Sequence, residues 1–173
     1  MATFDATTAE CLVYSFHDGS VSKLACDLMH RVTKFELRVD DELRLIEAEL
    51  DARSLRVECA MRDGAADKVG LSAGDKQKID AHVAEHILRV DAFPRIRFFS
   101  VVAVRSDEGI NIRGVLQLQN CSRPVSTLAR LVHGRYQADL LIHQPSFGIK
   151  PFVSLLGTVR VKPDVLVRMR VPV

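Results

Sequence analysis

The strongest constraint on the fold is an alternation of apolar and polar residues along most of the chain. In RIRFFSVVAV, residues 95–104, one expected face carries Ile96, Phe98, Ser100, Val102 and Val104. After a turn at SDEG, INIRGVLQLQ repeats the pattern with a face made of Ile110, Ile112, Gly114, Leu116 and Leu118. Successive side chains of a β-strand point to opposite sides of a sheet, so this period of two predicts strands with one dry and one wet face.

Further stretches of the same character follow one another at hairpin spacing. They are LVYSF (12–16), KFELRVD (34–40), LRLIEAELD (43–51), VSTLARLV (125–132), RYQADLLIH (135–143), GTVRVK (157–162) and VLVRMRV (165–171). Turn residues at His133-Gly134 and Pro163-Asp164 separate the later ones. About eight strands of this kind predict a mainly β chain, an antiparallel meander closed into a barrel or folded into a sandwich.

One segment, LSAGDKQKIDAHVAEHILRVDAFP, breaks the two-residue period. Ser72 and Asp75 have the spacing of a capping box, and the segment should stop before Phe93-Pro94 because the residue ahead of a proline favours extended geometry. At 3.6 residues per turn, one side of the helix gathers Ile79, Val83, His86, Ile87 and Val90. We expect one amphipathic helix over residues 72–90, lying against the barrel with His86 on its buried side.

Length and charge limit the classes of function. A chain of 173 residues is one domain of ordinary size, long enough to enclose a substantial apolar core. Lys and Arg number 24 against 22 Asp and Glu, a balance that predicts no nucleic-acid partner. No stretch reaches the roughly 18 apolar residues of a spanning helix, so no stable membrane insertion is expected.

The cysteines and the first residues of the sequence bear on the cellular compartment in which the protein is expected. Cys11, Cys26, Cys59 and Cys121 are widely separated and form no C-x-x-C pair, which fits small buried thiols kept reduced. The start, MATFDATTAECLVYSF, has no basic segment leading into an apolar one, so no signal peptide is seen. The expected location is cytoplasmic.

The sharpest catalytic motif is HVAEH, residues 82–86. In H-x-x-E-H helices, two histidines one turn apart hold zinc and the glutamate activates a water. His82, Glu85 and His86 have that spacing, but such sites need a further carboxylate, and the only later glutamate is Glu108 in an expected turn. A zinc hydrolase with His82 and His86 as ligands is therefore kept as an alternative, and a helix that merely buries a histidine is the simpler interpretation.

The order of elements resembles that of the YceI-like family, above all in FPRIRFFSVVAV, GVLQLQNCSRPV and SFGIK followed by paired terminal strands. The resemblance runs from about Leu12 to Val171. It implies a single domain, residues 1–173, folded as an antiparallel eight-stranded lipocalin-like barrel with a helix beside it. It also implies a long apolar pocket for a polyisoprenoid, a quinone or a fatty-acid derivative, with no cofactor, and a possible homodimer.

The residues themselves favour a hollow barrel. The dry face carries the small residues Ala48, Ser100, Gly114 and Ala138 at mid-strand, where larger side chains would close the interior. In IHQPSFGIKPF, Pro145 and Pro151 prevent regular pairing, and Phe147, Ile149 and Phe152 are too apolar for a bare loop, so we expect them to fold over the barrel mouth. Lys150 could then meet a polar head group.

The resulting hypothesis is non-enzymatic binding, sequestration or carriage of a long-chain amphiphile, a lipid or isoprenoid. The expected ligand-binding residues are Ile79, Val83, His86, Phe98, Ser100, Ile112, Gly114, Leu116, Tyr136, Ala138, Leu140, Phe147, Lys150 and Met169. Besides the zinc hydrolase, a protein-interaction module stays open, although the polar outer face speaks against it.

Overall fold

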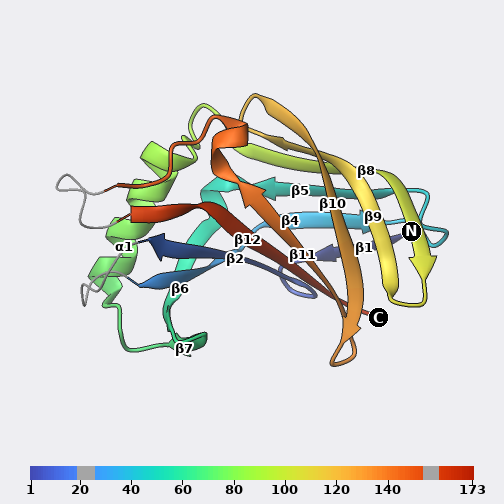
Figure 1. Cartoon of the computed structure of the whole chain (residues 1–173), viewed down its shortest axis with the longest axis horizontal. Coiled ribbons are helices and arrows are strands. Elements are labelled where there is room, and N and C mark those ends of the chain that lie inside the picture. Colours follow the sequence, from blue (N-terminus) through green and yellow to red (C-terminus); the bar gives the residue numbers. More distant parts are fainter. Residues whose placement is uncertain (19–25, 154–159) are drawn as a thin grey trace.

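The computed structural model describes residues 1–18, 26–153 and 160–173, and in these it is mainly β with one α-helix. A single antiparallel sheet curls into a half-barrel, and the helix lies across one end (Figure 1). The strands are β1 (Ala2–Asp5), β2 (Glu10–Asp18), β3 (Asp27–Val32), β4 (Phe35–Val39), β5 (Ile46–Asp51), β6 (Leu55–Arg62), β7 (Ala65–Asp67), β8 (Arg95–Ser106), β9 (Gly109–Leu118), β10 (Cys121–Val132), β11 (Arg135–His143) and β12 (Arg160–Pro172). The helical elements are α1 (Ala73–His82), the π-helical turn η2 (Val83–Ile87) and the 3-10 turns η1 (Ala52–Ser54) and η3 (Gln144–Phe147).

The fold class is as predicted, but within the described residues the sheet has twelve strands rather than eight. Two long strands are each broken by a bend: β3 leads into β4 at Thr33-Lys34, and β5 leads into β6 through η1. The bend is held by backbone bonds from Thr33 N–H to Ser54 O at 3.1 Å and from Asp51 N–H to Lys34 O at 3.0 Å. The short strands β1 and β7 add to the two sheet edges. The paired strands β3–β4 and β5–β6 form one bent hairpin. Its β5 pairs with β8 and its β3 pairs with β2, so this hairpin connects the two sides of the curled sheet.

The hairpins from β8 to β11 follow the expected turns. Ser106 faces Gly109 across the turn of SDEG, and Val132 faces Arg135 across His133-Gly134. His133 and Gly134 have φ values of 49° and 74°, the left-handed conformation that two-residue hairpin turns require. These turns fix the register of the neighbouring strands, so the inward faces of β9 and β11 are those that the alternation predicted.

The expected turn at Pro163-Asp164 is wrong. These residues lie inside β12, which runs from Arg160 to Pro172 with a register shift against β2 between Val161 and Val165. Proline has no N–H to donate, and such an irregularity is a position where a strand tolerates it. Residues 157–159 of the expected strand GTVRVK lie outside the described residues.

A β-bulge divides β8 into two parts with opposite orientation. Ser100 pairs with Gly114 but Val102 pairs with Arg113, so Val101 is an extra residue on this strand. One extra residue reverses the side to which all later side chains point. Val104, expected inside, is therefore 54% exposed, and Ala103 packs on the core in its place. The predicted face of β8 is right up to the bulge and wrong beyond it.

The helix begins as predicted and ends differently. Asp75 N–H donates to Ser72 Oγ at 3.0 Å and Ser72 N–H to Asp75 Oδ2 at 3.1 Å, which completes the capping box. After His82 the backbone widens into η2, where Leu88 N–H donates to Val83 O, an i to i+5 bond of 2.8 Å. The wider turn changes the angle between successive side chains, and the His86 side chain is 58% exposed rather than buried. The placement of His86 on the buried side was wrong.

Candidate ligand-binding cavity

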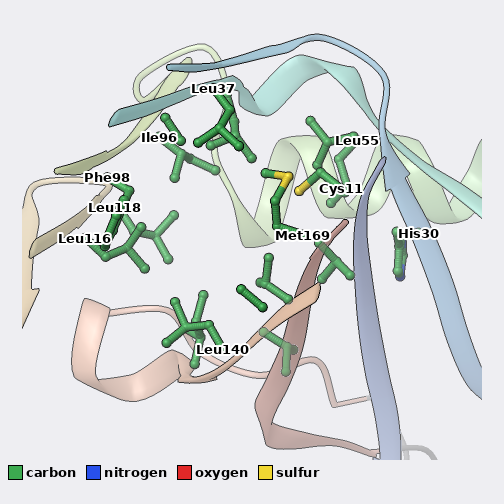
Figure 2. A pocket seen from close by; sticks show the side chains of 18 of the residues that line it. Cys11, His30, Leu37, Leu55, Ile96, Phe98, Leu116, Leu118, Leu140 and Met169 are labelled. Carbon is green, nitrogen blue, oxygen red and sulfur yellow. The ribbon is translucent and has the colours of Figure 1, made fainter. Parts of the chain in front are cut away.

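A cavity of about 920 Å³ lies inside the curled sheet, and its lining is predominantly apolar. This volume falls in the range of about 300–1,000 Å³ that small-molecule sites occupy. Figure 2 shows side chains from opposite sides of the sheet, among them Leu37, Phe98, Leu116, Leu140 and Met169, converging on one space. Small side chains at Ala48 and Ala138 are part of the lining. The interior is therefore hollow, and its wall is built from the alternating dry face of the strands.

Most of the residues expected to bind ligand line this cavity. They are Ile79, Val83, Phe98, Ile112, Leu116, Tyr136, Ala138, Leu140 and Met169. Phe98, Ile112, Leu116, Tyr136, Ala138 and Leu140 sit on β8 before its bulge, on β9 or on β11, whose register the hairpin turns fix, and Met169 sits on β12, where it pairs with Ala138 of β11. Their contact with a ligand remains a prediction, but their position on the cavity wall is given by the fold.

Gly114 and Ser100, expected to leave open space, are not in the lining. A Cβ at Gly114 would lie 2.6 Å from the Phe98 ring, so that ring already occupies the room beside the glycine. Ser100 Oγ accepts a hydrogen bond of 2.8 Å from Ile46 N–H and holds β5 against the bulge of β8. Both small residues therefore serve the packing and pairing of the sheet.

The loop IHQPSFGIKPF behaves partly as expected. Ile149 and Phe152 contribute to the cavity lining. Phe147 is 4% exposed but packs behind the wall in a cluster with Leu116 and Ile142. Lys150 is exposed and lies outside the lining, as His86 does. Gly148, with φ of 74°, permits the chain to turn back at the end of η3.

The sequence reasoning missed the side of the cavity built by β2, β3 and the segment after β5. The missed lining residues on this side include Cys11, Val13, Leu28, His30, Val32 and Leu55, and Leu37 of β4 was missed as well. The strand β6, with the sequence LRVECAMR, has a clear two-residue period that would have revealed it. Strands β1 and β7 have only four and three residues, too few for a period to be recognised.

Charged side chains of the lining stand at the two ends of the cavity. Lys78 and His82 belong to α1, which covers one end of the half-barrel, and His17 and Asp51 lie at the ends of β2 and β5, which finish on that side (Figure 1). Asp40, Asp41 and Arg105 belong to the opposite end, where strands β4 and β8 finish. Asp40 is engaged there by the Glu42 N–H and by Arg44, and these bonds lower the pKa of its carboxyl. Between the ends, the wall is mostly hydrocarbon.

The HVAEH motif does not assemble a metal site in the described part of the chain. The ring centroids of His82 and His86 lie 4.9 Å apart, but Glu85 is 76% exposed and lies outside the cavity lining. No group of three or more potential ligands comes together among residues 1–18, 26–153 and 160–173. His82 instead packs edge-on against the Phe152 ring at 4.9 Å. Burial, followed by the nearby His86, lowers the pKa of His82.

His30 is the polar residue buried most deeply in the lining. Its side chain on β3 is 4% exposed and belongs to the cavity wall (Figure 2). Burial lowers the pKa of its imidazole to about 4, so the ring is neutral at ordinary pH. Cys11, also in the wall, is fully buried, and burial raises the pKa of its thiol to about 12, which makes it an unreactive apolar surface.

No helix within the described residues is long and apolar enough to cross a membrane. All four cysteines are free.

Comparison with known proteins finds similarity in structure only. No family model matches the sequence, and no curated protein matches it. Among solved structures, BcnA of Burkholderia cenocepacia has a TM-score of 0.62 at 13% identity, with 96% of both chains covered. A polyisoprenoid-binding domain from Saccharophagus degradans, implicated in plant cell wall breakdown, has a TM-score of 0.52 at 10% identity, with 95% of this chain and 94% of that chain covered. The YceI protein of Campylobacter jejuni has a TM-score of 0.55 at 11% identity, with 89% and 86% covered. At these identities the likeness concerns the fold.

Proposed function

This chain has the YceI-like fold that its sequence motifs predicted, and from that premise we propose that it binds and carries or sequesters a long-chain amphiphile without catalysis. The observation that supports the proposal is the cavity of about 920 Å³ with its predominantly apolar lining. The Saccharophagus degradans domain of the same fold is a polyisoprenoid-binding domain. A polyisoprenoid, a quinone or a fatty-acid derivative is the kind of ligand that we propose for this chain.

The driving force for such binding is removal of hydrocarbon from water. Each Å² of apolar surface buried contributes roughly 25 cal/mol before the cost of ordering the ligand is subtracted. A flexible chain gains this energy from any wall of aliphatic side chains that it can contact, and Leu37, Leu116, Leu140 and Met169 offer such a wall. Polar groups are then needed only to fix the head.

A binding role is also favoured over hydrolysis by the helix that carries the H-x-x-E-H motif. Glu85 and His86 are 76% and 58% exposed and lie outside the cavity lining, so they are badly placed to act on anything held in the cavity. The single-domain organisation, the cytoplasmic location and the homodimer belong to the same proposal. The four free cysteines are compatible with a reducing compartment.

Native mass spectrometry of gently purified protein, with organic extraction and metal analysis of the same sample, tests the proposal. We expect wild-type protein to carry a lipid of defined mass. Ala138→Trp places a large ring in the cavity from β11 and should lose the lipid. Leu141→Trp is the matched control, since Leu141 is on the same strand but 60% exposed outside the lining.

Three outcomes contradict the proposal. Lipid retained equally by Ala138→Trp would place the ligand elsewhere than in the cavity. Stoichiometric zinc without lipid, lost in His86→Ala, would support the hydrolase instead. Protein without lipid that also fails to take up any added long-chain compound contradicts binding altogether.

A further inference from the structure

The side chain of His30 is the starting point, because its Nδ1 atom is buried without a hydrogen-bond partner. The residue is 4% exposed, and no group among the described residues bonds to this nitrogen. At the same time His30 is part of the cavity wall, on the β3 side of the space shown in Figure 2. Leaving a buried polar atom unpaired destabilises a fold, so such an atom needs an explanation.

The local backbone has an irregularity at this position. Met29 pairs with Cys59 but His30 pairs with Val57, so Glu58 is an extra residue on β6. The Val57 N–H is then bonded by Asp80 Oδ1 of α1 at 2.7 Å, and Glu58 turns to Arg31 on the other side of the sheet. Bulges often re-aim a side chain next to a binding site, and this one is buttressed from two sides.

The surroundings of His30 are apolar. Its cross-strand neighbour on β2 is Val13, and Leu28 and Val32 precede and follow it on the same face of β3. Burial is the sole cause of the low pKa of this histidine, and no charged group contributes to it. The other histidines and the charged side chains of the lining are Lys78, His82, His17 and Asp51 towards the helix end and Asp40, Asp41 and Arg105 towards the opposite end.

A neutral imidazole in such a wall selects for a particular chemistry. Nδ1 is covered by its neighbours in this structure, so the ring must turn to present this nitrogen to a ligand. In one tautomer Nδ1 then donates to a carbonyl oxygen, and in the other it accepts from a hydroxyl. Either partner satisfies the nitrogen without bringing a charge into the apolar wall. A carboxylate or phosphate at the same place would lose its hydration and find no cation to replace it, which is unfavourable.

We propose that His30 binds the head group of the amphiphile and that this head is an uncharged oxygen group, a carbonyl or a hydroxyl. The class of ligand is then a quinone, a ketone or an alcohol with a long hydrocarbon chain, and not a free fatty acid or a prenyl phosphate. This inference rests on the proposed function and narrows it. The ligand is oriented by one hydrogen bond at His30, and its chain occupies the rest of the cavity.

The test uses four probes with the same chain: 1-dodecanol, 2-dodecanone, dodecane and dodecanoate. Affinities are measured at pH 8 by displacement of an apolar fluorescent dye from the full chain. The variants are His30→Leu, which removes the polar atom, and His30→Asn, which keeps an amide near the position of Nδ1. Val13→Ala is the control, because it removes apolar surface opposite His30 without touching a polar group.

For wild-type protein we expect the alcohol and the ketone to bind more tightly than dodecane, and dodecanoate to bind most weakly. His30→Leu should weaken the alcohol and the ketone by about 5- to 10-fold, the loss expected for one hydrogen bond, and leave dodecane unchanged or tighter. His30→Asn should restore most of that loss. Val13→Ala should weaken all four probes by similar factors.

Other results separate the two proposals. If dodecane binds but His30→Leu weakens every probe equally, or dodecanoate binds as tightly as the alcohol, the head group is not at His30 and only this inference is wrong. A tight carboxylate would point to Lys78 at the helix end. If no probe binds wild-type protein, the carrier function itself is wrong, and this inference with it.

Discussion

The two sides of the cavity are built in different ways. One side, which we call the regular side, consists of β9, β10 and β11, which pair in continuous register through tight turns. The other side, the corner, consists of β3, β6, α1 and η2, with a bulge at Met29/His30 and a π-helical turn after His82. The regular side contributes the hydrocarbon surface of Ile112, Leu116 and Leu140 to the cavity lining, whereas the corner contributes His30 and His82. The difference indicates that the regularly paired strands form most of the apolar lining, whereas the two buried or half-buried histidines lie beside irregular backbone.

On the regular side, the largest expected change in the free energy of unfolding follows from replacing Gly114 by alanine. Its Cβ would collide with the Phe99 carbonyl oxygen and stand 2.6 Å from the Phe98 ring. Because the backbone oxygen belongs to the β8–β9 pairing, it cannot move away cheaply, and we expect a loss of about 3 kcal/mol or more in the free energy of unfolding. Urea denaturation followed by circular dichroism measures it.

The same substitution in the corner should act in the opposite direction. Gly74 lies in the first turn of α1, where the nearest atom to an added Cβ is Ser72 Oγ at 3.8 Å. Gly74→Ala should stabilise the protein by about 0.5–1 kcal/mol, since alanine loses less backbone entropy in a helix. If both alanines destabilise equally, the close packing assigned to Gly114 is not the cause.

His30 makes the stability of the corner depend on pH. Its pKa is about 4 in the folded protein against an ordinary value of 6.5. The unfolded chain therefore binds a proton first as the pH falls, so the stabilising difference is fully present above pH 6.5 and is lost towards pH 4. Between pH 7 and pH 4, wild-type protein should lose about 3 kcal/mol more than His30→Leu. Thermal or urea unfolding at several pH values measures the difference.

This comparison isolates His30 from the other groups. The pKa of His82 is also lowered, which acts in the same direction, but His82 is present in both proteins and cancels in the difference. Parallel stability profiles for wild type and His30→Leu would mean that His30 is accessible to water in the folded protein. The proposed hydrogen bond to a neutral head group would then lose its physical basis.

The sequence predicts the regular side of the cavity better than the corner. The alternation in β9 and β11 placed Ile112, Leu116, Tyr136, Ala138 and Leu140 on the cavity side, because uninterrupted pairing preserves the period of two. That part of the cavity and the mainly β class were predictable. The likeness to the YceI-like fold was predictable from ordered motifs although no family model matches.

The rest depends on single-residue irregularities that have no signature in the alternation. The extra residue Val101 reverses the side to which the later side chains of β8 point. The π-helical turn places His86 outside the cavity lining. His30 was not among the residues expected to bind ligand, since a histidine on a short strand has the pattern of an exposed polar residue and only the folded structure shows that it is buried. Tertiary contacts decide these positions.

The tie between α1 and β6 is the next test of the corner. Val57 is 5% exposed, and its N–H donates to Asp80 Oδ1 at 2.7 Å. Asp80→Ala leaves this N–H unpaired and should lower the free energy of unfolding by about 2 kcal/mol. Asp80→Asn keeps an oxygen acceptor and should lose less than half of that. Hydrogen exchange at the Val57 amide should speed up in the alanine variant, and unchanged protection would contradict the tie.

The smallest expected loss of stability concerns Ser100, where the bulge of β8 meets the regular part of the sheet. The alternation predicted that its hydroxyl binds ligand, whereas Ser100 Oγ accepts the Ile46 N–H at 2.8 Å and lies outside the cavity lining. Ser100→Ala should therefore lower stability by about 1 kcal/mol, the loss of one hydrogen bond, and leave the affinity for 1-dodecanol unchanged. Urea unfolding and dye displacement on the same sample separate the two quantities. Weaker dodecanol binding at unaltered stability would return Ser100 to the ligand site, and the polar groups of the cavity would then come from both sides.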